Sequence, residues 1–310
     1  MKGSAGLESI VVRQLTKKYR NLTAVNGISF TIKQGEIFGM LGPNGAGKTT
    51  TVEILVGLRS ADAGEIRVLG FDPAAHKEKL HQKIGVQLQM PALFPRLTVG
   101  ESLKLHASFY PAPFPVDQVL EWIGLADRVK TQTYKLSGGQ LQRLAVGTAM
   151  ISNGDIIFLD EPTTGLDPQA RRQMWAVIGQ LKAMGKTIFL TTHYMEEAQY
   201  LCDRVAIIDH GSIIALGTPE QLISEHFAEK AIELPQVLAE HKESLLNLPG
   251  VTRIQADGDK ITLYAAQVEA AIRELIQREA AGVLTLSGLS VRSASLEDVF
   301  LKLTGRSMRQ

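Results

Sequence analysis

Several features that would narrow the function at once are absent from this sequence or scarce in it. Its 310 residues include one cysteine, Cys202, so an internal disulfide is excluded. The residues around Cys202 have the pattern of an amphipathic helix running into a strand, which predicts a buried core thiol rather than a reactive one. The formal net charge of +1 gives no indication of a protein that coats nucleic acid, and we expect no nucleic-acid partner.

Long apolar runs are missing as well. No window approaches the roughly 20 apolar residues that a helix needs to cross a bilayer. The N-terminal residues lack the apolar stretch and cleavage site of a signal peptide. If the protein serves a membrane, we therefore expect it to do so through a partner. The 45% hydrophobic and 21% charged residues are ordinary for a globular protein, and the length suffices for one large domain or two modest ones.

The first two-thirds of the chain alternates short β-branched runs with amphipathic stretches. Helices are predicted over residues 48–57 and 169–183. Strands are predicted over residues 10–14, 27–31, 36–41, 155–159, 187–190, 205–209 and 212–215. Strand–helix–strand units with continuous apolar strands are typical of a parallel sheet covered on both faces, so we predict an α/β core. A helical insertion is predicted over residues 91–153, a stretch broken by Pro91, Pro95, Pro111, Pro113 and Pro115.

The pattern changes near residue 225, where we place a boundary between a domain of residues 1–224 and a smaller one of residues 225–310. Predicted there are a strand at 231–233, a helix at 236–247, and a hairpin of 251–256 with 260–265. The hairpin turn is Asp257-Gly258-Asp259, a strong turn signal. The order then continues with a helix, a strand at 283–292 and a last helix. The order β-α-β-β-α-β is that of the split βαβ pattern, so a small α+β domain is predicted.

The sequence indicates the buried face of one helix of this second domain and the first residues of another. The first carries Val268, Ile272, Leu275 and Ile276 on one face. Ser295 and Asp298 have capping-box spacing at the start of a final helix over residues 296–304.

A glycine-rich loop follows the apolar strand at 36–41 and precedes a helix. It matches the pattern G-x-x-x-x-G-K-[ST], in which glycines allow backbone N–H groups to surround a polyphosphate at the positive end of a helix. We predict that Lys48 contacts the β- and γ-phosphates and that the Thr49 hydroxyl ligates Mg²⁺. A plain tight turn is the alternative, and the strand–loop–helix context argues against it. The loop residues are Gly42, Pro43, Asn44, Gly45, Ala46, Gly47, Lys48, Thr49 and Thr50.

Two carboxylates end the apolar strand at 155–159. Asp160, at the strand tip, is predicted to hold Mg²⁺ through water. Glu161 is predicted to act as the general base on the attacking water. Acidic residues after a strand often mark a solvated loop, but the phosphate loop elsewhere in the sequence favours the functional interpretation.

A second anion site is predicted where Ser137-Gly138-Gly139-Gln140 precedes an amphipathic helix. A capping hydroxyl, exposed amides and a helix N-terminus favour an anion there, although a simple helix cap is the alternative. Since the phosphate loop already holds a nucleotide, a second site needs its own ligand. A head-to-tail dimer, in which each subunit closes on the ATP of the other, supplies one.

The segments GPNGAGKTT, LSGGQ, IIFLDEP and TTH, in this order, resemble the ATP-binding subunit of an ABC transporter over about residues 8–224. The resemblance implies a P-loop NTPase core with an antiparallel β subdomain and an inserted helical subdomain, and ATP and Mg²⁺ as cofactors. It implies an ATPase that works as a homodimer or paired cassette with separate transmembrane permease subunits. It also implies a peripheral location at the cytoplasmic face of the cell membrane.

Further site residues follow from the resemblance. Tyr19 is similar to the aromatic residue that stacks on adenine, and His193 to the switch histidine that contacts the γ-phosphate. Gln89 is similar to the glutamine that senses Mg²⁺ and the attacking water, with Gln87 as the neighbouring alternative. Asp167 is similar to the residue of the loop that crosses the dimer interface. The lysine, both carboxylates, the signature serine and the histidine are all present, so an active ATPase is implied.

The segment from Ser295 to Gly305 resembles the C-terminal end of bacterial multidrug-export ATP-binding subunits of the daunorubicin-resistance type. The resemblance implies export, with Leu296, Val299, Phe300 and Leu303 packing a terminal helix. Two other classes stay open. A soluble ABC ATPase of translation or DNA repair usually carries two cassettes, coiled coils or zinc modules, none of which is visible. A non-hydrolytic regulator is expected to lack Lys48 or Glu161.

Overall fold

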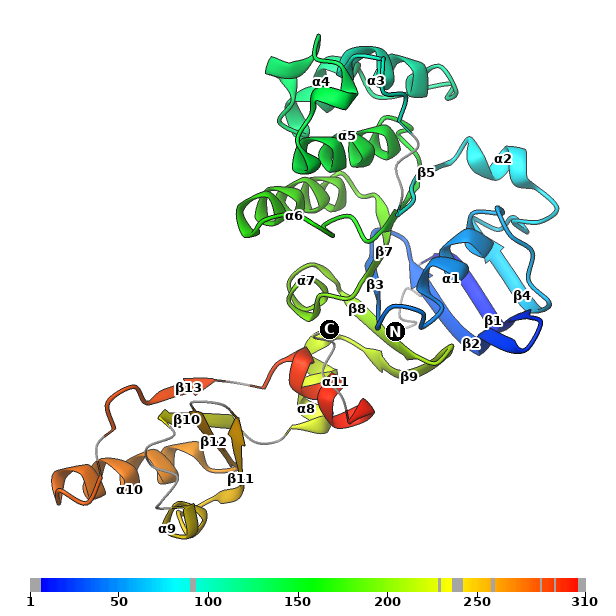
Figure 1. Cartoon of the computed structure of the whole chain (residues 1–310). Coiled ribbons are helices and arrows are strands. Elements are labelled where there is room, and N and C mark those ends of the chain that lie inside the picture. Colours follow the sequence, from blue (N-terminus) through cyan, green and yellow to red (C-terminus); the bar gives the residue numbers. More distant parts are fainter. Residues whose placement is uncertain are drawn as a thin grey trace, which may run out of the picture. The chain divides into compact units, whose positions relative to one another are not determined.

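The computed structural model describes residues 7–89, 93–227, 230–235, 242–257, 260–284, 286–292 and 294–305. These residues separate into two compact units, with the division between Pro219 and Glu220 (Figure 1). The division lies a few residues before the predicted boundary because a helix missing from the sequence analysis, α8 (Pro219–His226), begins there.

A six-stranded sheet in the order β5-β6-β7-β3-β8-β9 forms the centre of the first unit. The five strands from β5 to β8 pair in parallel, and β9 pairs antiparallel with β8. The residues of β3, β6 and β7 are buried throughout, which explains their continuous apolar sequences. The strands are β3 (Ile37–Leu41), β5 (Ile84–Gln87), β6 (Ile156–Asp160), β7 (Thr187–Thr192), β8 (Arg204–Asp209) and β9 (Ser212–Gly217).

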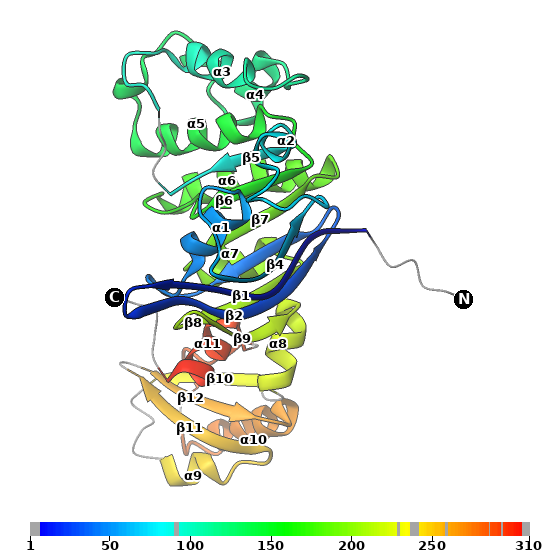
Figure 2. The same cartoon turned by 90° about the vertical axis from the view of Figure 1, so that its right-hand side faces the viewer.

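Helices lie on both faces of this sheet, with α1 (Lys48–Leu55) on one face and α6 (Pro168–Ala183) and α7 (Met195–Leu201) on the other (Figures 1 and 2). The predicted α/β core is therefore confirmed. Cys202 follows α7 and is buried, as expected for a core thiol.

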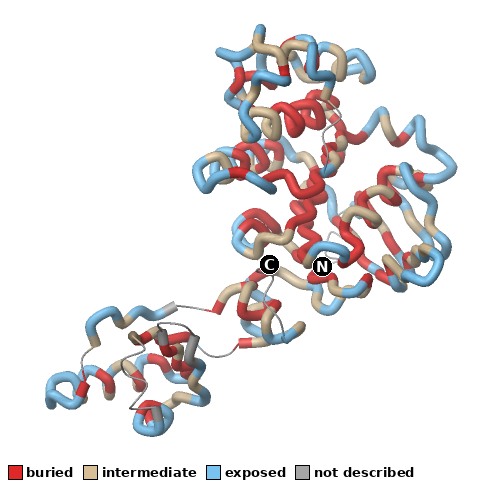
Figure 3. The backbone as a smooth tube through the Cα atoms, viewed as in Figure 1, coloured by how far each residue is buried: buried red, intermediate tan, exposed pale blue. Residues whose placement is uncertain are grey.

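A second, antiparallel sheet in the order β2-β1-β4 packs beside α1 (Figure 2). Its strands are β1 (Glu8–Tyr19), β2 (Leu22–Lys33) and β4 (Ala63–Val68), so two predicted short strands are parts of long ones. A row of stacked or tilted phenylalanine rings joins the two sheets. The distance between ring centres is 5.2 Å for Phe30 and Phe38, 6.0 Å for Phe38 and Phe189, and 5.8 Å for Phe189 and Phe158. These rings belong to the main core, which forms the continuous buried region of Figure 3.

The predicted insertion between β5 and β6 is helical in the described residues, which begin at residue 93 there. Pro91 lies outside them. The helices are α3 (Val99–Ala107), α4 (Val116–Trp122), the short η1 (Ala126–Arg128) and η2 (Thr133–Lys135), and α5 (Gly138–Met150). The short helix α2 (Lys77–His81), which precedes β5, was not predicted from the sequence.

The second unit contains an antiparallel sheet in the order β11-β12-β10-β13. Together with α10 (Val268–Ala280) and α9 (Lys242–Leu246), this gives the chain order β-α-β-β-α-β of the split βαβ pattern. The terminal helix α11 (Leu296–Thr304) has the predicted Ser295–Asp298 capping box. The strands are β10 (Lys230–Pro235), β11 (Val251–Asp257), β12 (Lys260–Ala265) and β13 (Ser290–Arg292).

Three details of the second unit differ from the prediction. Ile276 is 54% exposed, because the buried face of α10 runs through Val268, Ala271 and Leu275 instead. The predicted strand at 283–292 is confined to β13, since the preceding residues form turns. The turn residues Gly258 and Asp259, and the first part of the predicted helix at 236–247, lie outside the described residues.

Candidate active site

The glycine-rich loop joins β3 to α1, as predicted, and close packing requires glycine at two of its positions, Gly42 and Gly47. A Cβ atom on Gly42 would lie 2.3 Å from the carbonyl oxygen of Ile208, and one on Gly47 would lie 2.3 Å from that of Ala24. Gly47 also has a left-handed φ of 103°, which favours glycine. The loop is therefore fixed against β2 and β8, with the N-terminus of α1 at its end.

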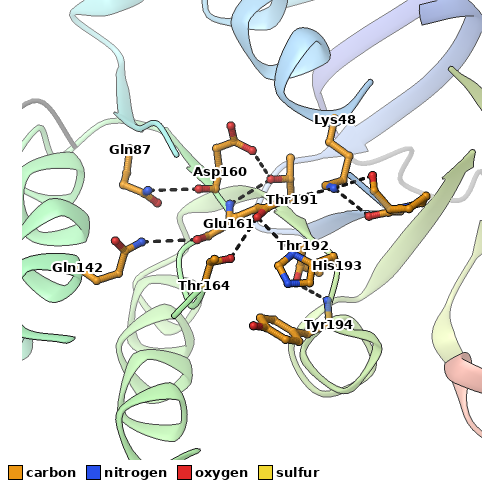
Figure 4. Close-up of polar contacts among 12 residues, drawn as sticks. Lys48, Gln87, Gln142, Asp160, Glu161, Thr164, Thr191, Thr192, His193 and Tyr194 are labelled. Atoms are coloured by element: carbon orange, nitrogen blue, oxygen red, sulfur yellow. Dashed lines mark hydrogen bonds and ion pairs between the residues drawn. The ribbon is translucent and has the colours of Figure 1, made fainter. Parts of the chain in front are cut away.

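Lys48 is the first residue of α1, and its side chain is buried over the loop. Its Nζ donates hydrogen bonds to the carbonyl oxygens of Gly42 at 2.8 Å and Pro43 at 3.1 Å. The same Nζ lies 3.1 Å from Glu161 Oε1 (Figure 4). The lysine ammonium thus joins the loop to the acidic end of β6.

Glu161 is the residue on which these contacts converge. Its Oε2 lies 3.2 Å from His193 Nδ1 and accepts a hydrogen bond from Thr164 Oγ1 at 3.1 Å. Its backbone has a φ of 52°, unusual for a residue with a side chain, and its N–H donates to Thr191 Oγ1 at 3.1 Å. This backbone turns the carboxylate from the strand tip toward Lys48 and His193.

The electrostatic environment keeps Glu161 ionised. The contact with His193 is the largest influence, and the Lys48 ammonium acts in the same direction against burial, so that the pKa of Glu161 falls to about 2. A carboxylate held in this state accepts hydrogen bonds and does not donate them.

Asp160 is wholly buried beside Glu161. Its Oδ1 accepts a hydrogen bond from the Oγ1 of Thr191, the residue opposite Asp160 in the β6–β7 pairing. Its Oδ2 is buried without a hydrogen-bond partner among the described residues. Burial raises the pKa of Asp160, while the hydroxyls of Thr191 and Thr49 oppose that rise. A buried carboxylate oxygen without a partner, next to a hydroxyl of the phosphate loop, suits a divalent cation that prefers oxygen ligands.

The two candidate glutamines at the end of β5 lie differently. Gln87 is buried, and its Nε2 donates to the Asp160 carbonyl oxygen at 3.2 Å (Figure 4). Gln89 is exposed, two residues farther along the chain. The structure therefore brings Gln87 rather than Gln89 to the carboxylate cluster.

Ser137 caps the N-terminus of α5, and the cap uses Gln140 in a way that the sequence analysis did not predict. Ser137 Oγ accepts a hydrogen bond from the Gln140 N–H at 3.3 Å, and Gln140 Oε1 accepts one from the Ser137 N–H at 3.0 Å. Ser137 and Gly138 are exposed, and a Cβ on Gly138 would meet nothing within 4 Å. Gly139 instead lies next to the loop before α6, where a Cβ would lie 3.6 Å from Leu166.

The two remaining predicted residues lie at element ends. Asp167 caps α6, and its Oδ1 accepts hydrogen bonds from the N–H groups of Gln169 and Ala170 at 2.9 and 2.8 Å. Tyr19 ends β1, and its ring centre lies 5.3 Å from the Arg59 guanidinium.

Threonines around Glu161 are the residues that sequence reasoning missed. The Thr191 hydroxyl accepts a hydrogen bond from the Glu161 N–H and donates one to the Asp160 carboxylate. The Thr164 hydroxyl donates a hydrogen bond to the Glu161 carboxylate. For Thr191 a signal existed, since adjacent parallel strands that end at the same edge place Thr191 opposite Asp160. For Thr164 no sequence pattern pointed to the contact.

Fold and site together define the class: a P-loop nucleotide-binding protein with a buried carboxylate beside its phosphate loop. Comparison with known proteins specifies it further. The family model described as "ABC transporter" matches residues 25–164, and that described as "Nodulation factor export protein NodI, C-terminal domain" matches residues 237–305.

Curated relatives are similar over nearly the whole chain. A Nod factor export ATP-binding protein I of Ralstonia nicotianae is 39% identical, over 96% of this chain and 94% of its own. The linearmycin resistance ATP-binding protein LnrL of Bacillus subtilis is 38% identical, over 95% of this chain and 98% of its own. The chain belongs to the ATP-binding subunits of ABC transporters, and it is an ATPase of that family.

Solved structures of ABC transporter cassettes have a similar fold. An ATP-binding subunit of an ABC transporter, 23% identical, matches the fold with a TM-score of 0.67 over 95% of this chain and 99% of its own. A dimeric cassette in a post-hydrolysis state bound to ADP and Pi is 25% identical, with a TM-score of 0.62 over 67% of this chain and 98% of its own. Among the helices of the described residues, none is long and apolar enough to cross a membrane.

Proposed function

We propose that this protein hydrolyses ATP at a site shared by two cassettes and thereby powers export through a separate membrane permease. The observation that carries the chemistry is the cluster in which Glu161 lies between the phosphate-loop Lys48 and His193. Similarity over nearly the full length to two proteins named for export and for resistance supports the direction.

In this proposal Glu161 is the general base. Its carboxylate is ionised and fixed at both oxygens, so that it can accept a hydrogen bond from the attacking water and orient it. A pKa of about 2 makes a weak base. Because Lys48 contributes to that low pKa, contact of Lys48 with the β- and γ-phosphates of ATP would raise the basicity of Glu161 at the moment when it is needed.

Asp160 and Thr49 are the proposed holders of Mg²⁺. Gln89, which is exposed two residues after β5, stays the candidate further ligand from the sequence, although Gln87 is the glutamine that contacts Asp160 here. The free Oδ2 of Asp160 and the neighbouring Thr49 hydroxyl support this assignment. These residues would hold Mg²⁺ beside the phosphate loop, where its positive charge would stabilise the negative charge of the phosphates. Gln87 holds the Asp160 backbone, and Tyr19 is the proposed stacking partner of adenine.

The second cassette is proposed to close on the nucleotide with the Ser137–Gln140 segment. Ser137 and Gly138 are exposed at the N-terminus of α5, a helix of 13 residues, where exposed amides and the helix dipole favour phosphate. Asp167, at the start of α6, is the proposed interface residue. Contacts present only with ATP would favour the closed dimer, and that difference in affinity would drive the attached permease.

We propose further that the protein acts at the cytoplasmic face of the cell membrane and that the exported compound is a drug or another hydrophobic molecule. The relatives named for Nod factor export and linearmycin resistance support export of such a compound. The permease is proposed to dock near residues 89–99, where β5 leads into the helical subdomain.

Affinity purification from membranes in mild detergent tests the partner. We expect a multi-span membrane protein to co-purify in stoichiometric amount. Ribosomes or DNA in its place would contradict the proposal and favour the soluble alternative of translation or DNA repair.

A further inference from the structure

Tyr194 occupies a position that tyrosine does not favour, the N-cap of α7. Serine, threonine, aspartate and asparagine are preferred there, because their side chains accept hydrogen bonds from the free N–H groups of the first turn. The Tyr194 side chain forms no such bond and is half-buried. Its ring instead contacts two side chains that come from different elements of the first unit.

The first contact is with His193, whose ring centre lies 4.1 Å from that of Tyr194 (Figure 4). Successive side chains of an extended strand point to opposite sides, so two neighbouring rings meet only where the strand has ended. Here β7 ends at Thr192, whose Oγ1 accepts a hydrogen bond from the Tyr194 N–H at 2.9 Å. This bond turns the chain around His193, and the two rings then lie side by side.

The second contact is with Arg171 of α6. The centre of its guanidinium group lies 4.1 Å from the centre of the Tyr194 ring, which is the geometry of a cation–π interaction. The Arg171 Nε is buried and has no hydrogen-bond partner among the described residues. Stacking on the ring, rather than a hydrogen bond from Nε, therefore holds this end of the arginine side chain.

Helix α6 gives the stack a fixed support. It is 16 residues long, and its residues Met174, Ile178 and Leu181 are wholly buried. The Arg171 N–H donates a hydrogen bond to the Asp167 carbonyl oxygen at 2.9 Å, so Arg171 belongs to the first turn of this helix. An arginine fixed in this way can hold an aromatic ring that belongs to a loop.

His193 needs such support because its contact with Glu161 does not fix the imidazole ring alone. The Nδ1 atom lies 3.2 Å from Glu161 Oε2 but forms no hydrogen bond of regular geometry among the described residues. The angle of the imidazole therefore depends on a further neighbour, and the Tyr194 ring is in contact with it. Since Nδ1 faces Glu161, Nε2 is the ring nitrogen left for the γ-phosphate.

We propose that Tyr194 and Arg171 are positioning residues of the ATPase site, whose stack holds the His193 ring with Nδ1 toward Glu161 and Nε2 available for the γ-phosphate. The inference rests on the role proposed for His193.

The test is ATP hydrolysis by the full-length protein carrying Y194A, Y194F or R171A. For Y194A we expect kcat to fall about five- to fiftyfold, because a misplaced group at the reacting phosphate lowers the rate of the chemical step. ADP lacks the γ-phosphate, so the Kd for ADP should stay within about twofold of wild type. Y194F keeps the aromatic ring and should keep kcat within about twofold of wild type. R171A should lower kcat in the same sense as Y194A.

Two controls match these variants in residue type and place. Tyr200 of α7 stacks on Trp175 of α6, with ring centres 4.9 Å apart, and Arg172 is the exposed neighbour of Arg171. Y200A and R172A should leave kcat unchanged. A double-mutant cycle tests the proposed route. Because Arg171 acts through Tyr194, R171A in a Y194A background should change kcat by less than about twofold.

The proposal is overturned if Y194A leaves kcat unchanged, if Y194F loses as much kcat as Y194A, if the Kd for ADP rises as much as kcat falls, or if the effects of R171A and Y194A on kcat multiply. If Y194A does not fold, Y194L, which keeps a larger apolar side chain without a ring, supplies the comparison with Y194F. Failure of the proposed function is a separate result, since it would show as undiminished hydrolysis by H193A or E161Q.

Discussion

At the scale of single residues, the carboxylate of Glu161 has two side-chain partners of opposite origin, one from the phosphate loop and one from the loop after β7. Glu161 contacts Lys48 through one oxygen and His193 through the other, and the side chain is almost wholly buried. Lys48 donates two further hydrogen bonds to the loop, and these bonds hold its ammonium group in place beside Glu161. This arrangement couples the charge of Glu161 to the stability of the fold as well as to catalysis.

A pH dependence follows from that coupling. The pKa of Glu161 falls from its ordinary 4.5 to about 2 in the fold, so the ionised side chain stabilises the folded protein above pH 4.5. This contribution should decline as the pH falls from 4.5 toward 2, where the folded state takes up the proton. Chemical denaturation of the wild type and of E161Q at several pH values measures it. The difference in unfolding free energy between the two should shrink over that window, and a difference independent of pH would contradict the assignment.

At the scale of elements, α10 offers a stability prediction with an internal control. Leu275 is 0% exposed in the core of the second unit, whereas its neighbour Ile276 is 54% exposed. L275A should therefore destabilise the protein by about 2–5 kcal/mol. I276A should change the unfolding free energy by no more than about 0.5 kcal/mol. Denaturant unfolding monitored by circular dichroism compares them, and equal losses would show that the helix packs on another face.

The same helix shows what sequence periodicity can and cannot determine. The pattern predicted a helix with Ile276 on its buried face, but packing in the core of the second unit buries Ala271 and leaves Ile276 exposed. The buried strands β3, β6 and β7 were predictable because a short continuous apolar run that ends in polar residues is typical of a strand buried on both faces. The long strands β1 and β2 were predicted only in part, because residues beyond their apolar centres pair with each other without an apolar signal.

For the site, local sequence patterns were sufficient to indicate the phosphate loop, Asp160, Glu161 and Ser137. No sequence pattern pointed to the Thr164 contact of Glu161. The Thr191 contact depends on the pairing of β6 with β7, which brings together residues 30 apart in sequence. Gln140 lies in the predicted segment but serves as the partner of Ser137 in the cap. Spacing identifies the residues of a site, while their hydrogen-bond partners depend on which strands and loops become neighbours.

At the scale of the whole molecule, the exposed Ser137 at the start of α5 predicts an assembly that depends on ATP. In the E161Q background, ATP with Mg²⁺ should convert the protein to a dimer, because the second cassette binds the retained nucleotide. E161Q/S137R should bind ATP and remain monomeric, since arginine at an exposed position blocks the approach without touching the phosphate loop.

Light scattering with and without ATP measures the dimer. E161Q/S108R is the control, because Ser108 is an exposed residue at the end of α3, away from the segment that is proposed to bind phosphate. Dimers of E161Q/S137R in equal amount would remove Ser137 from the proposed interface.

Release of inorganic phosphate by E161Q tests the central claim most directly, with nucleotide binding measured on the same sample. E161Q should bind ATP about as well as the wild type, and its phosphate release should fall by a factor of at least about 100, as expected for loss of a general base. E65Q, which changes an exposed carboxylate of β4 that pairs with Arg13, should release phosphate at the wild-type rate. Phosphate release by E161Q at the wild-type rate would contradict the assignment of Glu161 as the base.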